Sequence, residues 1–301
     1  MPEVILPAGR ISYEDVGSGP PVVFVHGLLV DGRLWRDVVR GLDGLRCIVP
    51  DLPLGSHQTA MAPDADLSPP AVADLLAAFL DALGLPEATI VANDTGGAIA
   101  QMLAARHPQR ITRLLLTPCD TYDNFLPRTF RYLQAVPRIP GGLVMLTQSM
   151  RIRPLRRLPF AFGRLTKRPV ERALMDAWLE PARRDRGVRR DVAKVLRGIC
   201  RRDLVEAAET LKELERPVLL AFAPEDPFFK FEHAERMARE LPDARLERIE
   251  DSYAFAPLDQ PDRVAELVRE FVAARPSGTA AVGGIRSVCR RLALNIWRHI
   301  R

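Results

Sequence analysis

An alternation of strand-like and helix-like segments constrains the fold of this chain more than any other feature of its sequence. The strand-like segments are short apolar runs, and the helix-like segments have one apolar face. The predicted strands are 10–16, 21–25, 46–50, 88–92, 111–117, 217–223 and 245–249, and the predicted helices are 34–42, 69–83, 95–106, 231–241 and 262–273. This order predicts an α/β fold whose sheet is mostly parallel and carries helices on both faces.

The segment 121–213 departs from this alternation. Its sequence is helical and rich in arginine, and prolines such as Pro137, Pro154 and Pro169 interrupt it repeatedly. We therefore expect a helical cap, 121–213, inserted into a core formed by 1–120 and 214–274.

Residues 275–301 begin with a run of small residues, PSGTAAVGG, that is typical of a flexible linker. Apolar residues then recur at helical spacing, with arginines mostly opposite them. This pattern predicts a basic amphipathic helix, which could make a weak contact with an anionic membrane surface or with a second copy of the chain. The alternative is a short tail that docks on its own domain or frays.

The net charge of +5 is unevenly distributed along the chain. Residues 151–202 carry 17 Lys and Arg against 5 Asp and Glu, and residues 275–301 carry six Arg and no acid, which leaves −13 for the rest. A basic segment over an acidic body could steer anionic substrates, or it could be a solvated helical surface. Aromatic residues do not interleave with the basic residues, so the sequence predicts no nucleic-acid partner.

The cysteines and the N-terminus indicate a cytoplasmic protein. Cys47, Cys119, Cys200 and Cys289 lie far apart and form no CxxC pair, which argues against a zinc site or a disulfide framework. The N-terminus has neither the basic nor the apolar part of a signal peptide, and no stretch is long and apolar enough to span a bilayer. The oligomeric state is not predicted.

The string TIVANDTGGAIA, residues 89–100, carries most of the functional information. An apolar strand runs through Asn93, Asp94 and Thr95 into a helix that begins with two glycines. In a nucleophile elbow, G-x-Nuc-x-G, a sharp strand-to-helix turn lifts one side chain above the sheet. Here Ala92 replaces the first glycine and Asp94 takes the nucleophile position. Taken alone, the same string could be a helix with an N-terminal capping aspartate.

A second string, VVFVHGLL at 22–29, has the form of an apolar strand followed by an oxyanion loop. The backbone N–H groups of Leu28 and Thr95 would together bind an anion beside Asp94. The other candidates for contact with substrate are His26, Gly27, Asn93 and Trp35.

With the string LLAFAPEDP at 219–227 as the third in order, residues 10–273 resemble the α/β-hydrolase superfamily. The resemblance implies that Asp226, just past a late strand, is the acid of the site. An aspartate nucleophile under a helical cap resembles the haloalkane dehalogenases and epoxide hydrolases, whose members form an alkyl ester and hydrolyse it with water that a histidine activates. It implies a small organic substrate such as a haloalkane, epoxide or ester, with no metal and no organic cofactor.

The sequence departs from that branch in several places. Haloalkane dehalogenases typically hold halide with a Trp after the nucleophile and an Asn after the His-Gly pair, where this chain has Thr95 and Leu28. Tyr122 and Tyr132 are the candidates for the cap tyrosines that activate an epoxide. Counting back from Asp259-Gln-Pro places Ala254 where the histidine belongs, and a methyl group cannot act as a base.

Another residue would therefore have to activate water. His57 follows a strand at the carboxyl end of the sheet, the edge at which α/β proteins bind ligands, so it is the candidate base. Its alternative role is that of a loop histidine packed against the cap. Asp120 and Asp123 lie at the same edge and could supply an alternative acid or cap a turn.

Three functions remain open at this point. In the first, Asp94 is the nucleophile of a hydrolase, with Asp226 and His57 as its partners. In the second, Asp94 is the base of a lyase or isomerase, which needs no histidine-driven hydrolysis. In the third, a degenerate hydrolase binds a ligand in the retained pocket.

Overall fold

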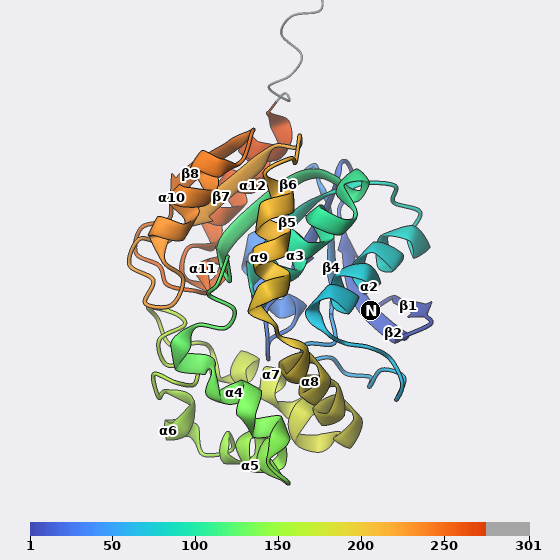
Figure 1. The fold of residues 1–301 in the computed structure, drawn as a ribbon, viewed down its shortest axis with the longest axis vertical. Helices are drawn as coiled ribbons and strands as arrows, with labels where there is room; N and C mark the ends of the chain where they lie inside the picture. The colour runs from blue at the N-terminus through green and yellow to red at the C-terminus, as the bar shows by residue number, and fades with distance from the viewer. Residues whose placement is uncertain (275–301) are drawn as a thin grey trace, which may run out of the picture.

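The computed structural model describes residues 1–274 and consists of one twisted sheet, the helices that cover it and a group of helices below it (Figure 1). The predicted linker and amphipathic helix at 275–301 lie outside the described residues. None of the described helices is long and apolar enough to cross a membrane.

Eight strands form the sheet, in the order β1-β2-β4-β3-β5-β6-β7-β8. The two strands at one edge, β1 and β2, are antiparallel to their neighbours, and the strands from β4 to β8 are parallel. The strands are β1 (Glu3–Leu6), β2 (Gly9–Val16), β3 (Pro21–Val25), β4 (Arg46–Pro50), β5 (Ala88–Asp94), β6 (Ile111–Cys119), β7 (Val218–Phe222) and β8 (Ala244–Arg248). This confirms the predicted α/β-hydrolase architecture of a mostly parallel sheet.

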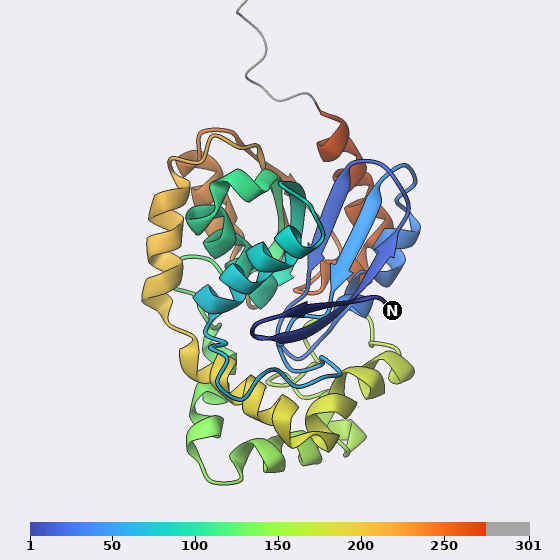
Figure 2. The ribbon, with the colours of Figure 1, turned by 90° about the vertical axis from the view of Figure 1, so that its right-hand side faces the viewer.

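Helices cover both faces of the sheet (Figure 2). On one face α2 and α9 pack against α3, and on the other α1 packs against α12. The core helices are α1 (Arg36–Arg40), α2 (Pro69–Ala82), α3 (Thr95–Arg106), α9 (Arg201–Leu211), α10 (Phe231–Glu240), α11 (Ala256–Asp259) and α12 (Pro261–Ala273). Short 3₁₀ turns are η1 (Gly32–Trp35), η2 (Pro108–Arg110), η3 (Arg128–Phe130) and η4 (Val136–Arg138).

The central strands are apolar over their whole length because helices bury both of their faces. All residues of β7 are buried, as are those of β3 after Pro21. The predicted 34–42 helix divides into η1 and α1, and the four-residue edge strand β1 was not predicted.

Five helices lie together below the carboxyl edge of the sheet, between β6 and the start of α9 (Figure 1). They are α4 (Tyr132–Ala135), α5 (Gly142–Ser149), α6 (Arg153–Arg156), α7 (Arg172–Arg184) and α8 (Arg186–Gly198). We call these helices and the segments that join them the cap. Although α9 belongs to the same helical stretch of sequence, it packs against α3 beside the sheet.

Candidate active site

Asp94 lies at the turn where β5 ends and α3 begins. Its backbone has φ 55° and ψ −135°, a conformation that residues other than glycine rarely adopt and that surrounding structure must enforce. The two glycines after Thr95 allow the helix to start close to the sheet. A Cβ at Gly96 would lie 2.3 Å from the carbonyl oxygen of His26, and one at Gly97 would lie 2.3 Å from Cβ of Cys119.

Two backbone N–H groups hydrogen-bond to the Asp94 carboxylate. The N–H of Leu28 donates to Oδ2 at 3.0 Å, and the N–H of Thr95 is the second donor. Gly27 must lack a side chain, since a Cβ there would be 2.0 Å from Oδ2. Burial raises the pKa of Asp94 to about 6, and the two N–H groups oppose this shift. The carboxylate is therefore the main form at neutral pH.

His26 holds the loop that carries Leu28. Its Nε2 accepts a hydrogen bond from the N–H of Leu52 at 2.9 Å, so Nδ1 carries the proton and donates to the carbonyl of Gly27. Burial lowers the pKa of His26 to about 4, which keeps the ring neutral. His26 thus positions the loop and does not line the site.

A second buried acid, Asp120, lies beside Thr95. The Thr95 hydroxyl donates to Oδ2 of Asp120 at 3.3 Å. Burial, together with the charge of Asp94, raises the pKa of Asp120 well above its ordinary value. Asp123, the other acid of this edge, is exposed.

Asp226 follows β7, at the same edge of the sheet as Asp94. Its Oδ1 accepts hydrogen bonds from the N–H groups of Phe228 at 2.7 Å and Phe229 at 3.2 Å. Its Oδ2 is buried and has no partner among the described residues. Burial, with a smaller contribution from the Asp94 charge, raises the pKa of Asp226 to about 7. A buried acceptor without a donor is the feature that an absent imidazole N–H would leave.

Ala254 is fully buried between β8 and α11. Its carbonyl accepts a hydrogen bond of 2.8 Å from Nδ2 of Asn93, which also lies 2.9 Å from Oγ1 of Thr117 and from the carbonyl of Pro118. Asn93 therefore ties β5 to β6 and to the Ala254 segment. It does not line the cavity described below.

His57 is bonded to the cap. Its Nε2 lies 3.3 Å from Oδ2 of Asp191 on α8, and its Nδ1 accepts from the N–H of Gly55 at 3.3 Å. Asp191 also accepts the N–H of Met61 at 2.7 Å. His57 is not among the described residues that line the cavity with Asp94. The structure thus places it as the loop histidine packed against the cap, the alternative role expected from sequence.

Trp35 corrects another expectation. Its side chain is fully buried and packs on Phe24, with ring centroids 5.3 Å apart, and it does not line the cavity. Instead, Trp178 of α7 lines the cavity, as do Phe162 and Phe255. Phe255 follows Ala254 directly, and Trp178 is the only tryptophan in the predicted cap; these were the available signals.

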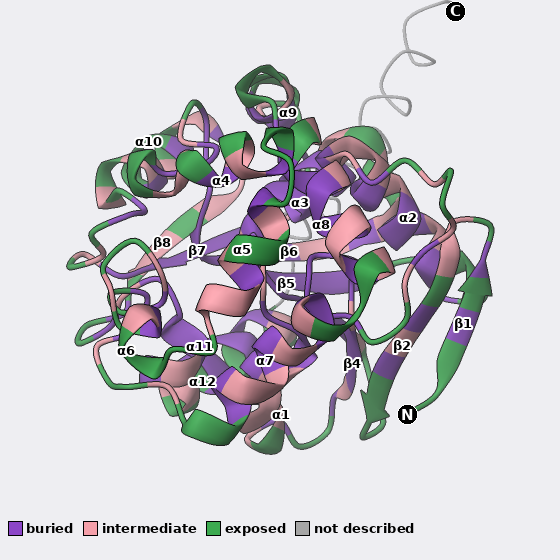
Figure 3. Ribbon diagram, turned by 90° about the horizontal axis from the view of Figure 1, so that it is seen from below, coloured by how far each residue is buried: buried purple, intermediate pink, exposed green. Residues whose placement is uncertain are grey.

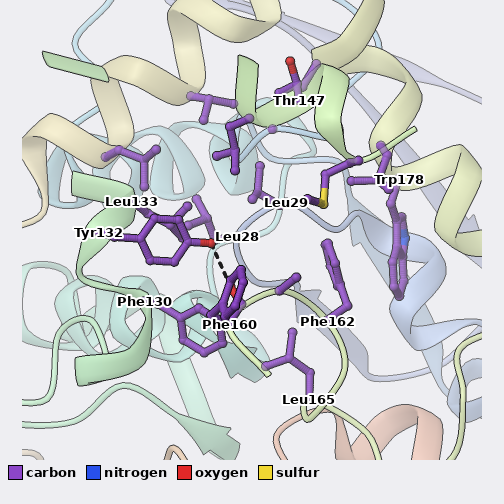
Figure 4. Close-up of a pocket in the computed structure, with 18 of the residues that line it drawn as sticks. Leu28, Leu29, Phe130, Tyr132, Leu133, Thr147, Phe160, Phe162, Leu165 and Trp178 are labelled. Carbon is purple, nitrogen blue, oxygen red and sulfur yellow. Dashed lines mark hydrogen bonds between the residues drawn. The ribbon is translucent and has the colours of Figure 1, made fainter. Parts of the chain in front are cut away.

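A cavity of about 230 Å³ lies between Asp94 and the cap (Figure 4). Leucine, phenylalanine and methionine side chains of the cap form most of its wall. The cap residues with the largest side chains there are Phe130, Tyr132, Met150, Phe160, Phe162 and Trp178. The loops of the core add Leu28, Leu29 and Asp94.

The polar wall groups other than Asp94 are already hydrogen-bonded within the protein. The hydroxyl of Tyr132 donates to the carbonyl of Phe160 at 2.7 Å, as Figure 4 shows. The indole N–H of Trp178 donates to Asp31 at 3.0 Å. The hydroxyls of Thr147 and Ser149 donate to carbonyls of their own helix. The Asp94 carboxylate is therefore the reactive group that the cavity offers to a ligand.

Comparisons with known proteins agree with this architecture. A family profile described as alpha/beta hydrolase fold matches residues 20–261. A haloalkane dehalogenase of Mesorhizobium japonicum is 38% identical over 138 residues, which is 44% of this chain and 44% of that protein. The chain thus spans less than half the length of this relative.

Two further proteins are similar over most of their length. Haloalkane dehalogenase 2 of Mycobacterium bovis is 28% identical over 273 residues, which covers 87% of this chain and 91% of that protein. The crystal structure of an ancestral haloalkane dehalogenase superposes with a TM-score of 0.74 at 24% identity, covering 91% of this chain and 100% of the other. At this identity the superposition shows the fold alone.

Proposed function

Because this chain belongs to the α/β-hydrolase superfamily, we propose that it is a hydrolase in which Asp94 attacks a small apolar substrate of the haloalkane, epoxide or ester type. The observation that carries the proposal is the half-buried Asp94 carboxylate, which lies at a strained backbone turn, accepts only backbone N–H groups and lines an apolar cavity. The cap, Asp94 as nucleophile and Asp226 as acid are parts of this proposal.

The first half-reaction needs only groups that are present. A carboxylate oxygen of Asp94 attacks an sp³ carbon, the new C–O bond forms, and the leaving group departs with its electron pair. The apolar wall excludes water from the nucleophile, which strengthens it. The Leu28 N–H, already 3.0 Å from Oδ2, stays on the oxygen that becomes the ester carbonyl.

The second half-reaction lacks its base. Water must attack the ester carbonyl carbon, and the oxyanion that forms can be held by the N–H groups of Leu28 and Thr95. A general base must take the proton from this water, but Ala254 offers a methyl group and His57 is bonded to Asp191. We therefore propose that hydrolysis of the ester is slow and that the alkyl-enzyme accumulates.

Assistance to the leaving group is also limited. The Trp178 indole and the Thr95 hydroxyl donate to Asp31 and Asp120, so neither is free to hold a halide. Tyr122 and Tyr132 donate to Glu240 and Phe160, so neither is free to protonate an epoxide oxygen. Substrates with good leaving groups, such as primary bromides and iodides, should react fastest.

Intact-protein mass spectrometry after incubation with panels of haloalkanes and epoxides, the two classes that are attacked at an sp³ carbon, tests the proposal. We expect a mass increase equal to one alkyl or hydroxyalkyl group, located on the peptide that contains Asp94. The Asp94→Asn variant, which keeps the volume of the side chain and removes its charge, should show none. An adduct on any other residue, or equal labelling of the variant, would rule out the nucleophile.

The pKa of Asp94 favours one second candidate function, that of a proton-transfer base in a lyase or isomerase. A carboxyl whose pKa is about 6 has a base strength close to the optimum for proton abstraction at neutral pH. Such an enzyme would form no adduct and would exchange a substrate C–H for deuterium in D₂O. Saturable binding with neither adduct nor exchange would instead support a ligand-binding protein.

A further inference from the structure

The outer surface of the cap combines a high positive charge with exposed apolar side chains. Ten Lys and Arg and no Asp or Glu occur between residues 124 and 170. Within that stretch, six large apolar side chains are exposed, although only ten such side chains are exposed in residues 1–274. The six are Tyr132, Ile139, Val144, Met145, Ile152 and Phe160.

The segments that carry these side chains lie together on one side of the molecule. They lie on or next to α4, α5 and α6, and Figure 3 looks directly onto these three helices from below. Met145, at the centre of α5, is 68% exposed, and Phe160 is 49% exposed. We call the six side chains, together with the arginines between them, the cap face.

Two grooves lined by arginines flank the apolar side chains. One, of about 550 Å³, is lined by Arg153, Arg156, Arg157, Lys167, Arg168 and Arg172. The other, of about 700 Å³, contains Ile139 and Val144 beside Arg138, Arg186, Arg189, Arg190 and Arg197. No carboxylate lines either groove. Arg156, Lys167, Arg168 and Arg190 are ion-paired with Asp176, Glu225, Asp251 and Asp191. The other seven named side chains form no ion pair within residues 1–274, so their positive charge is available to an external anion.

The rim of the cavity opens on the same face. Tyr132 and Phe160 line the cavity and are also exposed, and their rings are in contact, with centroids 6.4 Å apart. An apolar cavity whose rim is apolar and surrounded by cations is suited to face a surface that is apolar inside and anionic outside.

We propose that the cap face binds the surface of an anionic phospholipid bilayer. The side chains of Val144, Met145 and Phe160 insert among the acyl chains, and the arginines of the two grooves pair with lipid phosphates and carboxylates. Arginine suits this position because its stem packs on apolar groups while its guanidinium reaches the head groups. An acidic protein partner would explain the charge but not the apolar side chains that alternate with it.

Vesicle co-sedimentation of the full chain tests the proposal. The protein should bind vesicles of phosphatidylcholine that contain about 30 mol% phosphatidylserine, should not bind phosphatidylcholine alone, and should dissociate when salt rises from about 0.1 to 0.5 M. Binding to neither vesicle at low salt would overturn the proposal.

Two pairs of substitutions locate the surface. Val144→Ser with Met145→Ser removes apolar area from exposed positions of α5, and its matched control is Ile5→Ser with Val205→Ser, on β1 and α9. Arg151→Gln with Arg157→Gln removes charge from arginines that form no ion pair within residues 1–274, and its control is Arg40→Gln with Arg202→Gln. Each cap pair should weaken the partition constant by at least about tenfold.

Each control pair should leave the partition constant unchanged. Equal loss in a control, or undiminished binding of both cap variants, would show that another part of the chain binds the lipid. The inference does not rest on the proposed function, since Asp94→Asn should bind vesicles as the wild type does.

Discussion

The carboxylates at the ends of β5 and β7 differ in how many of their hydrogen-bond partners are present. At the end of β5, the Asp94 carboxylate has backbone donors in place, and glycines provide the room that its turn requires. At the end of β7, one oxygen of Asp226 accepts two backbone hydrogen bonds and the other is buried without a partner among the described residues. The first arrangement consists mostly of backbone, so the fold itself maintains it. On the proposed function, the second would depend on one imidazole, which a single substitution could remove without disturbing the fold.

The largest expected effect is at Asp94. Asp94→Asn should abolish adduct formation and turnover, because an amide is not a nucleophile. The melting temperature should stay the same or rise, since burial disfavours the ionised carboxylate that the substitution removes. Mass spectrometry and thermal unfolding measure the two outcomes. Residual activity at the wild-type level would show that Asp94, at the end of β5, is not the reactive group.

On the proposed function, a base placed beside Asp226 should restore hydrolysis of the alkyl ester on Asp94. Ala254→His would place an imidazole beside the orphaned oxygen of Asp226, so that the acid orients the ring and the ring deprotonates water. Turnover should rise by about 10²–10⁴-fold, and the adduct should disappear. Ala254→Leu is the control, because it fills the same space without a base. If both variants turn over substrate at the same rate, the imidazole at position 254 does not act as the base.

His57 should matter for stability and not for turnover. His57→Ala removes the ring that bonds to buried Asp191 and should lower the free energy of unfolding by about 1–3 kcal/mol. Denaturant unfolding measures the loss. The yield of adduct should stay unchanged. If the variant accumulates an adduct that the wild type does not show, His57 supplies the base after all.

The smallest effect concerns pH. In the folded state the pKa of Asp226 is about 7, whereas in the unfolded chain it is about 4. Between about pH 4 and 7 the folded protein therefore keeps a proton that the unfolded chain has lost. Stability therefore falls as pH rises through this window. Asp226→Asn removes the ionisable group and should be more stable than wild type at pH 8, with a smaller difference at pH 5. A difference that is independent of pH would show that this carboxyl is not buried as described.

The pH dependence of labelling provides a companion measurement. Asp94 with a pKa of about 6 should react slowly at pH 5 and reach a plateau above pH 7, since only the carboxylate attacks carbon. A labelling rate that does not change between pH 5 and 7 would contradict the raised pKa of Asp94.

Sequence was most informative where short-range pattern decides structure. The predicted bounds of β3, β4 and α3 agree with the structure, because continuous apolar runs and a glycine-rich start specify them locally. The position of Asp94 followed from the same string. The sequence could not distinguish the roles of Trp35 and Trp178, because the packing of the cap against the core decides which of the two indoles lines the cavity. The same holds for the role of His57, because its partner Asp191 lies 134 residues away on a cap helix.

The hydrogen bonds that occupy the cavity wall also determine how finely the protein can discriminate between ligands. Because the wall offers no free donor or acceptor apart from the Asp94 site, compounds compete only by how well they fill about 230 Å³. One methylene more or less in such an apolar pocket changes affinity by only about 1–3 kcal/mol. A hydroxyl added to the ligand would lose its water without gaining a partner, at a cost of about 1–3 kcal/mol. Homologous chain lengths should therefore be accepted in a graded series, and hydroxylated analogues should bind more weakly by a comparable amount.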